Sequence, residues 1–129
     1  DKLKEVVGKG NVSVDEKKGQ IIIRKAVDFE PRVRARAGPT AEFVDKGKAM
    51  EILRDVAGVL EVYSTAQVAI EGHTSTKDSD LDDYAFSLAR NRAAKVKAAL
   101  EELGISGSRM TAEGKPGKYG TGKKGVLMR

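Results

Sequence analysis

The chain contains a single histidine, His73, and it is the first residue whose chemistry could be catalytic. Three hydroxyl residues, Thr74, Ser75 and Thr76, follow it directly. A hydrolytic triad also needs a nucleophile on a strained turn and an orienting acid in defined geometry. No Gly-x-Ser-x-Gly motif of that kind occurs here. We therefore interpret His73 as a structural residue in a strand-to-loop turn, and we expect no enzymatic activity.

Four aspartates between residues 78 and 83 suggest a calcium loop. The segment lacks the glycine at the sixth position and the glutamate at the twelfth that an EF-hand loop requires. We interpret these carboxylates as caps at the positive end of a helix. The chain has no cysteine, and one histidine cannot form a zinc site alone. We expect neither a metal nor a cofactor.

Residues 114–125 combine five glycines with four lysines, which resembles a phosphate-binding loop. A P-loop lies between a strand and a helix, and that context is absent here. We expect a flexible Gly/Lys-rich loop instead. The net charge of +5 would permit contact with anionic polymers. Aromatic residues make up 5% of the chain and no aromatic strand motif typical of RNA-binding domains occurs, so we expect no nucleic acid partner.

Alternating and helical apolar periodicities predict one domain over residues 1–129, in the order β-β-α-β-α-β-β. The first ten residues are expected to form a flexible or helical lead-in. This order predicts an α+β fold, a two-layer α/β sandwich with two helices packed on one mixed sheet. The predicted elements are a hairpin over 11–29, a helix over 41–62, a strand over 67–71, a helix over 81–103, and strands over 109–112 and 126–128.

The first predicted helix should be capped by Thr40 and should bury one apolar stripe. The second should end at Gly104. Between the hairpin and the first helix, Arg32, Arg34 and Arg36 alternate with small residues. We favour a solvated basic loop there over a binding strip. The stripe of the first helix comprises Phe43, Met50, Leu53, Ala57 and Leu60.

Arg92 is the residue that departs from the pattern of its own helix. At about 100° per residue it falls in the middle of the apolar arc, between Leu88 and Val96. Arg90 and Lys97 fall on the opposite side. An arginine on a core-facing stripe costs desolvation energy unless its guanidinium finds an acceptor. It could extend to the edge of the sheet, pair with a carboxylate inside the protein, or bind an anionic ligand. Its apolar neighbours on the arc are Leu81, Ala85, Leu88, Val96, Ala99 and Leu103.

Two segments together resemble the OmpA C-terminal domain family. The segment 68–74 reads Val-Ala-Ile-Glu-Gly-His-Thr, and that family carries apolar residues followed by Gly-His-Thr-Asp. The next helix matches the family pattern L-x-x-x-R-A-x-x-V-x-x-x-L at Leu88, Arg92, Ala93, Val96 and Leu100. The resemblance implies an OmpA-like fold with a pocket at the end of the sheet. In that family the pocket holds the diaminopimelate of a peptidoglycan stem peptide, with the helix arginine on a carboxylate.

The resemblance breaks at Ser75, where the family has the aspartate that binds the ammonium group of diaminopimelate. A hydroxyl can accept a hydrogen bond but supplies no charge. A nearby aspartate, such as Asp78, could replace the carboxylate. The family asparagine and serine are also replaced, by Ala85 and Ala89. The candidate ligand-binding residues are Arg92, Ser75, Thr74, Leu88, Phe29 and Asp78.

The resemblance therefore implies a non-catalytic cell-envelope domain that binds peptidoglycan at the periplasmic face of a membrane. The parent protein would be tethered to the outer or inner membrane only by segments outside this chain. The alternative is a degenerate OmpA-like module that has lost cell-wall binding and contacts a protein partner. Ser75 is the feature that separates the two hypotheses.

Overall fold

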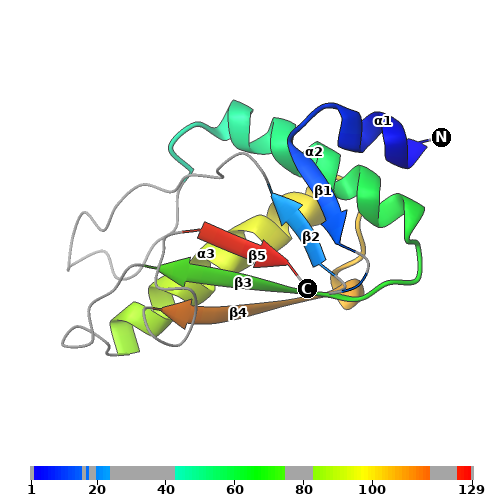
Figure 1. The fold of residues 1–129 in the computed structure, drawn as a ribbon. Helices are drawn as coiled ribbons and strands as arrows, with labels where there is room; N and C mark the ends of the chain where they lie inside the picture. The colour runs from blue at the N-terminus through cyan, green and yellow to red at the C-terminus, as the bar shows by residue number, and fades with distance from the viewer. Residues whose placement is uncertain are drawn as a thin grey trace.

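The computed structural model describes residues 2–15, 17, 20–23, 43–74, 83–116 and 125–128. The predicted order of helices and strands is confirmed (Figure 1). A short helix occupies most of the predicted lead-in, and one 3-10 turn precedes β4. The elements are α1 (Lys2–Gly8), β1 (Val12–Asp15), β2 (Gln20–Ile23), α2 (Lys46–Val62), β3 (Val68–Thr74), α3 (Asp83–Glu102), η3 (Gly107–Arg109), β4 (Met110–Pro116) and β5 (Gly125–Met128).

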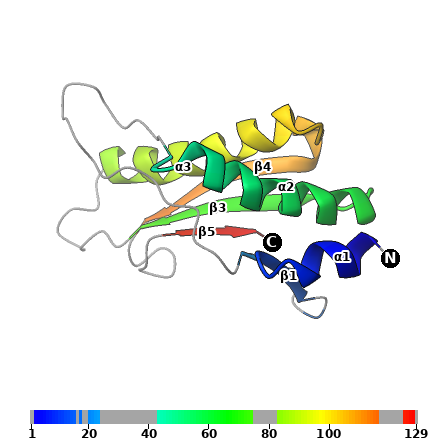
Figure 2. The same cartoon turned by 90° about the horizontal axis from the view of Figure 1, so that it is seen from above.

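The five strands form one mixed sheet in the order β1-β2-β5-β3-β4. Among these described strands only β3 and β4 run parallel, and α3 is part of the connection between them. The other neighbours are antiparallel. Figure 2 shows α2 and α3 on the same side of this sheet. The α/β sandwich expected from the sequence is thus the observed architecture.

The core lies between the two long helices and the sheet. On α2 the predicted stripe is confirmed, since Leu53, Ala57 and Leu60 are buried and Met50 is partly buried. On the sheet, Val68 and Ile70 are buried on the face that the helices cover. None of the described helices is long and apolar enough to span a bilayer. The largest fully buried side chains are those of Ile52, Leu53, Leu60, Ile70, Leu100, Val12, Val56, Val59 and Val96.

The predicted start of the first long helix was wrong. α2 begins at Lys46, and its N-cap is Asp45, whose side chain accepts a hydrogen bond of 3.0 Å from the Lys48 N–H. Aspartate is at least as strong an N-cap as threonine, and here it is Asp45 that satisfies an N–H group of the first turn. The later start leaves Phe43 outside the helix, where it still packs against the core. Thr40 lies outside the described residues.

Two strands are longer than predicted. β3 continues through Gly72 and His73 to Thr74, and β4 continues to Pro116. The extra residues pair with one another in parallel register, from Gly72 with Gly114 to Thr74 with Pro116. Residues 114–116 are therefore strand and not loop, and His73 lies within a strand and not in a turn. Residues 24–42, 75–82 and 117–124, which include the three alternating arginines, lie outside the described residues.

The predicted end of α3 at Gly104 is confirmed. Gly104 has φ +97°, a backbone conformation that costs glycine little. Its N–H donates to the Glu101 carbonyl at 3.0 Å, and the N–H of Ile105 donates to the Leu100 carbonyl at 3.1 Å. These two bonds are those of a Schellman motif. The buried Ile105 then directs the chain back under the helix toward β4.

Candidate functional site

The position of α3 over the sheet is set by two glycines. A Cβ atom built on Gly72 would overlap the backbone carbonyl oxygen of Ala89. One built on Gly114 would lie 2.7 Å from the carbonyl oxygen of Phe86 and 2.8 Å from the amide nitrogen of Arg90. The missing side chains allow the helix backbone to lie directly on β3 and β4. The last part of β3 is thereby placed against the middle of α3.

Arg92 lies on α3 at this same level and is buried, with 6% of its surface exposed. Leu88 and Val96, one turn away on either side, are buried as well. Burial lowers the pKa of the Arg92 guanidinium, because desolvation disfavours the charged form. Its buried Nε atom accounts for no hydrogen bond within the described part of the chain, although the residue as a whole is not without a partner. The arginine predicted to lie on the core-facing arc is thus inside the protein and not at a solvated edge.

A second cation of α3 lies one turn beyond Arg92. The Nζ atom of Lys95 lies 5.8 Å from the centre of the Phe43 ring, a distance typical of a cation–π contact. Phe43 precedes α2 in the chain, so this contact joins the start of α2 to the middle of α3. By contrast Arg90 is exposed, as its place opposite the apolar arc predicted.

Of the other candidate residues, Leu88 and Thr74 lie in the described part of the chain. Gly72 lies against α3, since a Cβ atom built on it would be 3.4 Å from the amide nitrogen of Ala93. Thr74 ends β3 two residues further on. The carboxyl end of β3 and the turn of α3 that carries Arg92 are therefore neighbours. Phe29, Ser75 and Asp78 lie outside the described residues.

Sequence reasoning did not single out the role of Arg109. This residue follows α3 in the chain, yet its guanidinium binds the end of α2. Its Nε donates to the Ala66 carbonyl at 3.0 Å, and one terminal nitrogen donates to the Leu60 and Tyr63 carbonyls at 2.9 and 2.6 Å. Carbonyls at the end of a helix have no partner within the helix and carry partial negative charge. Arg109 is thus a structural cap that connects α2 to β4.

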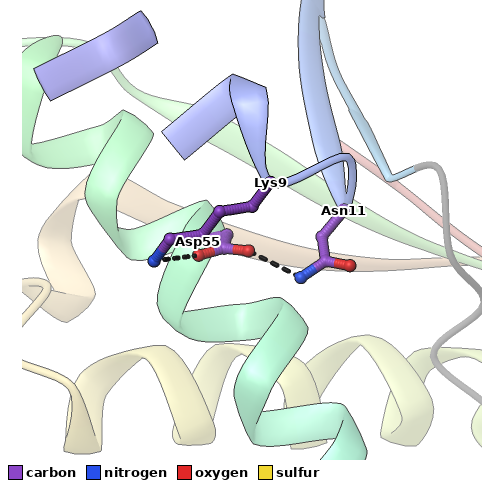
Figure 3. A network of polar contacts seen from close by, with 3 residues as sticks. All are labelled: Lys9, Asn11 and Asp55. Carbon is purple, nitrogen blue, oxygen red and sulfur yellow. Dashed lines mark hydrogen bonds and ion pairs between the residues drawn. The ribbon is translucent and has the colours of Figure 1, made fainter. Parts of the chain in front are cut away.

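Asp55 is a second buried charge that sequence reasoning missed. Its carboxylate accepts a hydrogen bond of 2.7 Å from the Asn11 side chain and lies 3.4 Å from the Lys9 Nζ (Figure 3). Both partners follow α1, so the contact holds the amino-terminal segment on α2. Val6 packs against Gly58 on the same side of α2. A signal was available, because Asp55 interrupts an apolar helix stripe just as Arg92 does.

The residue of this region whose chemistry could bind a negatively charged group is Arg92. Arg92 can offer a planar set of donors that matches a carboxylate. Within the described ranges, no group of three or more acidic or histidine side chains could hold a metal ion. His73 is a strand residue of β3, in register with Lys115 and Gly125.

Comparison with protein families identifies one match. The OmpA family matches residues 42–123, which is more than half of the chain and includes both α2 and α3. Among curated proteins, the photosystem I P700 chlorophyll a apoprotein A2 of Gloeobacter violaceus is 40% identical over 62 residues. That alignment covers 48% of this chain and 7% of the relative, so the likeness concerns one segment of a much longer protein.

Solved structures with the same fold come from several bacteria. The cell wall anchor of the T6SS from Pseudomonas aeruginosa has a TM-score of 0.59 at 18% identity, with 98% of this chain and 92% of that chain covered. A MotB-like protein from Desulfovibrio vulgaris has a TM-score of 0.60 at 13% identity, with 98% of this chain and 82% of that chain covered. An OmpA-like domain from Francisella tularensis has a TM-score of 0.54 at 14% identity, with 74% of this chain covered. The match covers 65% of that chain, so this chain spans just under two thirds of its length.

Proposed function

Because this chain belongs to the OmpA family, we propose that it is a non-catalytic binding domain of the bacterial cell envelope. Its ligand would be peptidoglycan, recognised through the diaminopimelate of the stem peptide. Arg92 would bind a carboxylate of that residue. Its location would be the periplasmic side of an envelope membrane, with any tether supplied by segments outside this chain.

The burial of Arg92 beside the end of β3 is the observation that carries this proposal. A guanidinium removed from water gains more from a carboxylate than an exposed one does, because less solvent screens the pair. The fork of donors also fixes the orientation of the ligand, which a lysine would not do. Leu88, buried one turn before Arg92, would contribute an apolar wall for the methylene chain of diaminopimelate.

The remaining contacts would come from the segment that follows β3. Thr74 and Ser75 would offer hydroxyl groups, and Asp78 would offer the carboxylate that Ser75 cannot. Phe29 would complete the apolar part of the pocket. Because a charged partner for the ammonium group is missing at position 75, we expect this domain to bind more weakly than a relative with aspartate there.

The substitution at Ser75 also favours a second candidate function. Without its charge pair, the pocket of an OmpA-like module could lose its ligand while the fold persists. Ala85 and Ala89, which replace polar residues of the family pattern, point in the same direction. In that case the domain would serve as a scaffold or protein-interaction module, and a protein partner would replace peptidoglycan.

The two candidates are separated by a titration of ¹⁵N-labelled domain with diaminopimelate and with a soluble muropeptide. If the domain binds peptidoglycan, the amides of 72–74 and 88–93 shift as ligand is added. Absence of shifts at about millimolar ligand, which corresponds to roughly 4 kcal/mol of binding, would refute the proposal and leave the scaffold function.

Two variants assign the binding residue. Arg92→Met should abolish the shifts, while Arg90→Met, at an exposed arginine of the same helix, should leave them unchanged. Ser75→Asp should strengthen binding by restoring the charge for the ammonium group. Retention of full affinity in Arg92→Met would show that another group binds the carboxylate.

A further inference from the structure

We propose that a second copy of this chain docks on the outer edge of β4 in antiparallel orientation, so that the two sheets form one continuous sheet. The two-fold axis would pass midway between the two Gly114 residues, and Glu113 of each copy would oppose Lys115 of the other. This interaction does not depend on peptidoglycan binding.

The first support is the place of β4 in the sheet. Among the described strands β4 is outermost, with β3 as its one neighbour. The outer edge of such a strand presents backbone N–H and C=O groups that another strand can pair with. Thr111 and Glu113 are exposed in the single chain. In a pair centred on Gly114, residues 112–116 of one copy would oppose the same residues of the other, which is enough for a short ladder.

The second support is the charge pattern along the edge. Gly114 faces α3, so by strand alternation Glu113 and Lys115 lie together on the opposite face of the sheet. In an antiparallel pair centred on Gly114, two Glu113–Lys115 pairs form between the copies. A pair centred on Glu113 would instead oppose the two glutamates, which is unfavourable. The charges therefore select one register.

The third support is the position of α3 in the helix layer. Because α3 lies on both Gly72 and Gly114, its axis runs above β3 and β4. Strands are spaced by about 4.8 Å, so the axes of two α3 helices related by this two-fold would be about 10 Å apart. That spacing is close to the distance of roughly 8–10 Å that is usual for packed helices. The two α3 helices can therefore pack against each other in the same dimer in which the two β4 strands pair.

The side chains at that helix contact are complementary. Gly114 lies beneath the segment between Phe86 and Arg90. A two-fold axis between the two Gly114 residues brings Phe86 of one copy opposite Arg90 of the other. Phe86 is a large apolar residue that is 38% exposed in the single chain. An arginine packed on an aromatic ring is favourable, and the contact would occur twice.

The test is the oligomeric state of the chain and of two charge-reversal variants, measured by sedimentation at a series of concentrations. We expect concentration-dependent dimers of the unaltered chain. Glu113→Lys and Lys115→Glu, each alone, oppose like charges and should raise the dissociation constant by about tenfold or more. Mixed in equal amounts, the two variants oppose unlike charges again, so a heterodimer should form. A chain that remains monomeric at about millimolar concentration would overturn the proposal.

Disulfide trapping tests the register, since the chain has no native cysteine. Glu113→Cys mixed with Lys115→Cys should cross-link rapidly, because the two positions are directly opposite. Each variant alone should cross-link slowly, because its two sulfurs would be diagonal across the axis. Rapid cross-linking of Glu113→Cys alone would overturn the register about Gly114. Lys17→Cys, at an exposed position after β1, serves as the control for random collision.

Discussion

Gly72 of β3 and Gly114 of β4 are register partners, and both lie against the backbone of α3. The pair forms a flat area on the sheet where side chains are missing from two adjacent strands. The helix rests on this area, and Arg92 is carried on the turn above it. The same two glycines therefore determine where the candidate ligand residue lies and how near α3 comes to the edge of the sheet.

Replacement of Gly72 by alanine should destabilise the domain by about 1–3 kcal/mol or more, because the new methyl group would overlap the Ala89 carbonyl and the helix backbone must move. Urea unfolding followed by circular dichroism would measure the loss. Gly8→Ala is the control, since a Cβ there meets no atom within 4 Å. If the two variants unfolded at the same urea concentration, the result would contradict the close approach of β3 to α3.

Replacement of Arg92 by lysine keeps the positive charge but removes the planar set of donors. If Arg92 binds a carboxylate through two hydrogen bonds, the variant should bind a muropeptide at least about tenfold more weakly. Isothermal titration with Arg90→Lys as the matched control would measure this. Equal affinity in the two variants would indicate that only the charge contributes.

The lowered pKa of Arg92 determines the direction in which pH changes the contribution of this residue to stability. Folding disfavours its protonated form, so the protonated guanidinium costs stability at neutral pH. This cost would decrease only as pH rises toward the pKa in the folded state. Between about pH 6 and 8 the protonation of Arg92, and with it carboxylate binding, should stay constant. Loss of affinity over that range would implicate a different group, and titrations at several pH values would reveal it.

Replacement of Asp55 by alanine should cost about 1–3 kcal/mol, because the buried side chain of Asn11 would lose its acceptor. Lys9→Ala should cost less than about 1 kcal/mol, because the lysine side chain is 64% exposed while that of Asp55 is 5% exposed. Chemical unfolding of both variants would show which of them loses more stability. A larger loss from Lys9→Ala would show that the ion pair, and not the amide, holds the amino-terminal segment.

Replacement of Arg109 by methionine should loosen the carboxyl end of α2, since the Leu60 and Tyr63 carbonyls there, and the Ala66 carbonyl beyond it, lose a charged donor. We expect a loss of about 1.5–3 kcal/mol. Hydrogen exchange should quicken at the last turn of α2, where the Tyr63 N–H is bonded to Val59. Arg54→Met, at an exposed arginine of the same helix, is the control. Unchanged exchange would mean that the cap is dispensable.

Several features of this protein could be predicted from local sequence because their causes are local. The apolar period of α2 and α3, the β1–β2 hairpin and the end of α3 at Gly104 depend on residues within a few positions of one another. The anomaly of Arg92 was visible for the same reason, since helical spacing alone places it between Leu88 and Val96. The resemblance to a family then added a ligand that periodicity could not name.

Other features depend on residues far apart in the chain. The full length of β3 and β4 follows from pairing between segments some forty residues apart, which overrides the glycines that suggested loops. The contacts of Arg109 and Asp55 join residues separated by 43 to 49 positions. No local pattern contains such pairs, because only packing decides which buried polar groups meet. Sequence alone therefore determined the elements and the unusual arginine, while the tertiary structure decided which elements meet and which charges are satisfied.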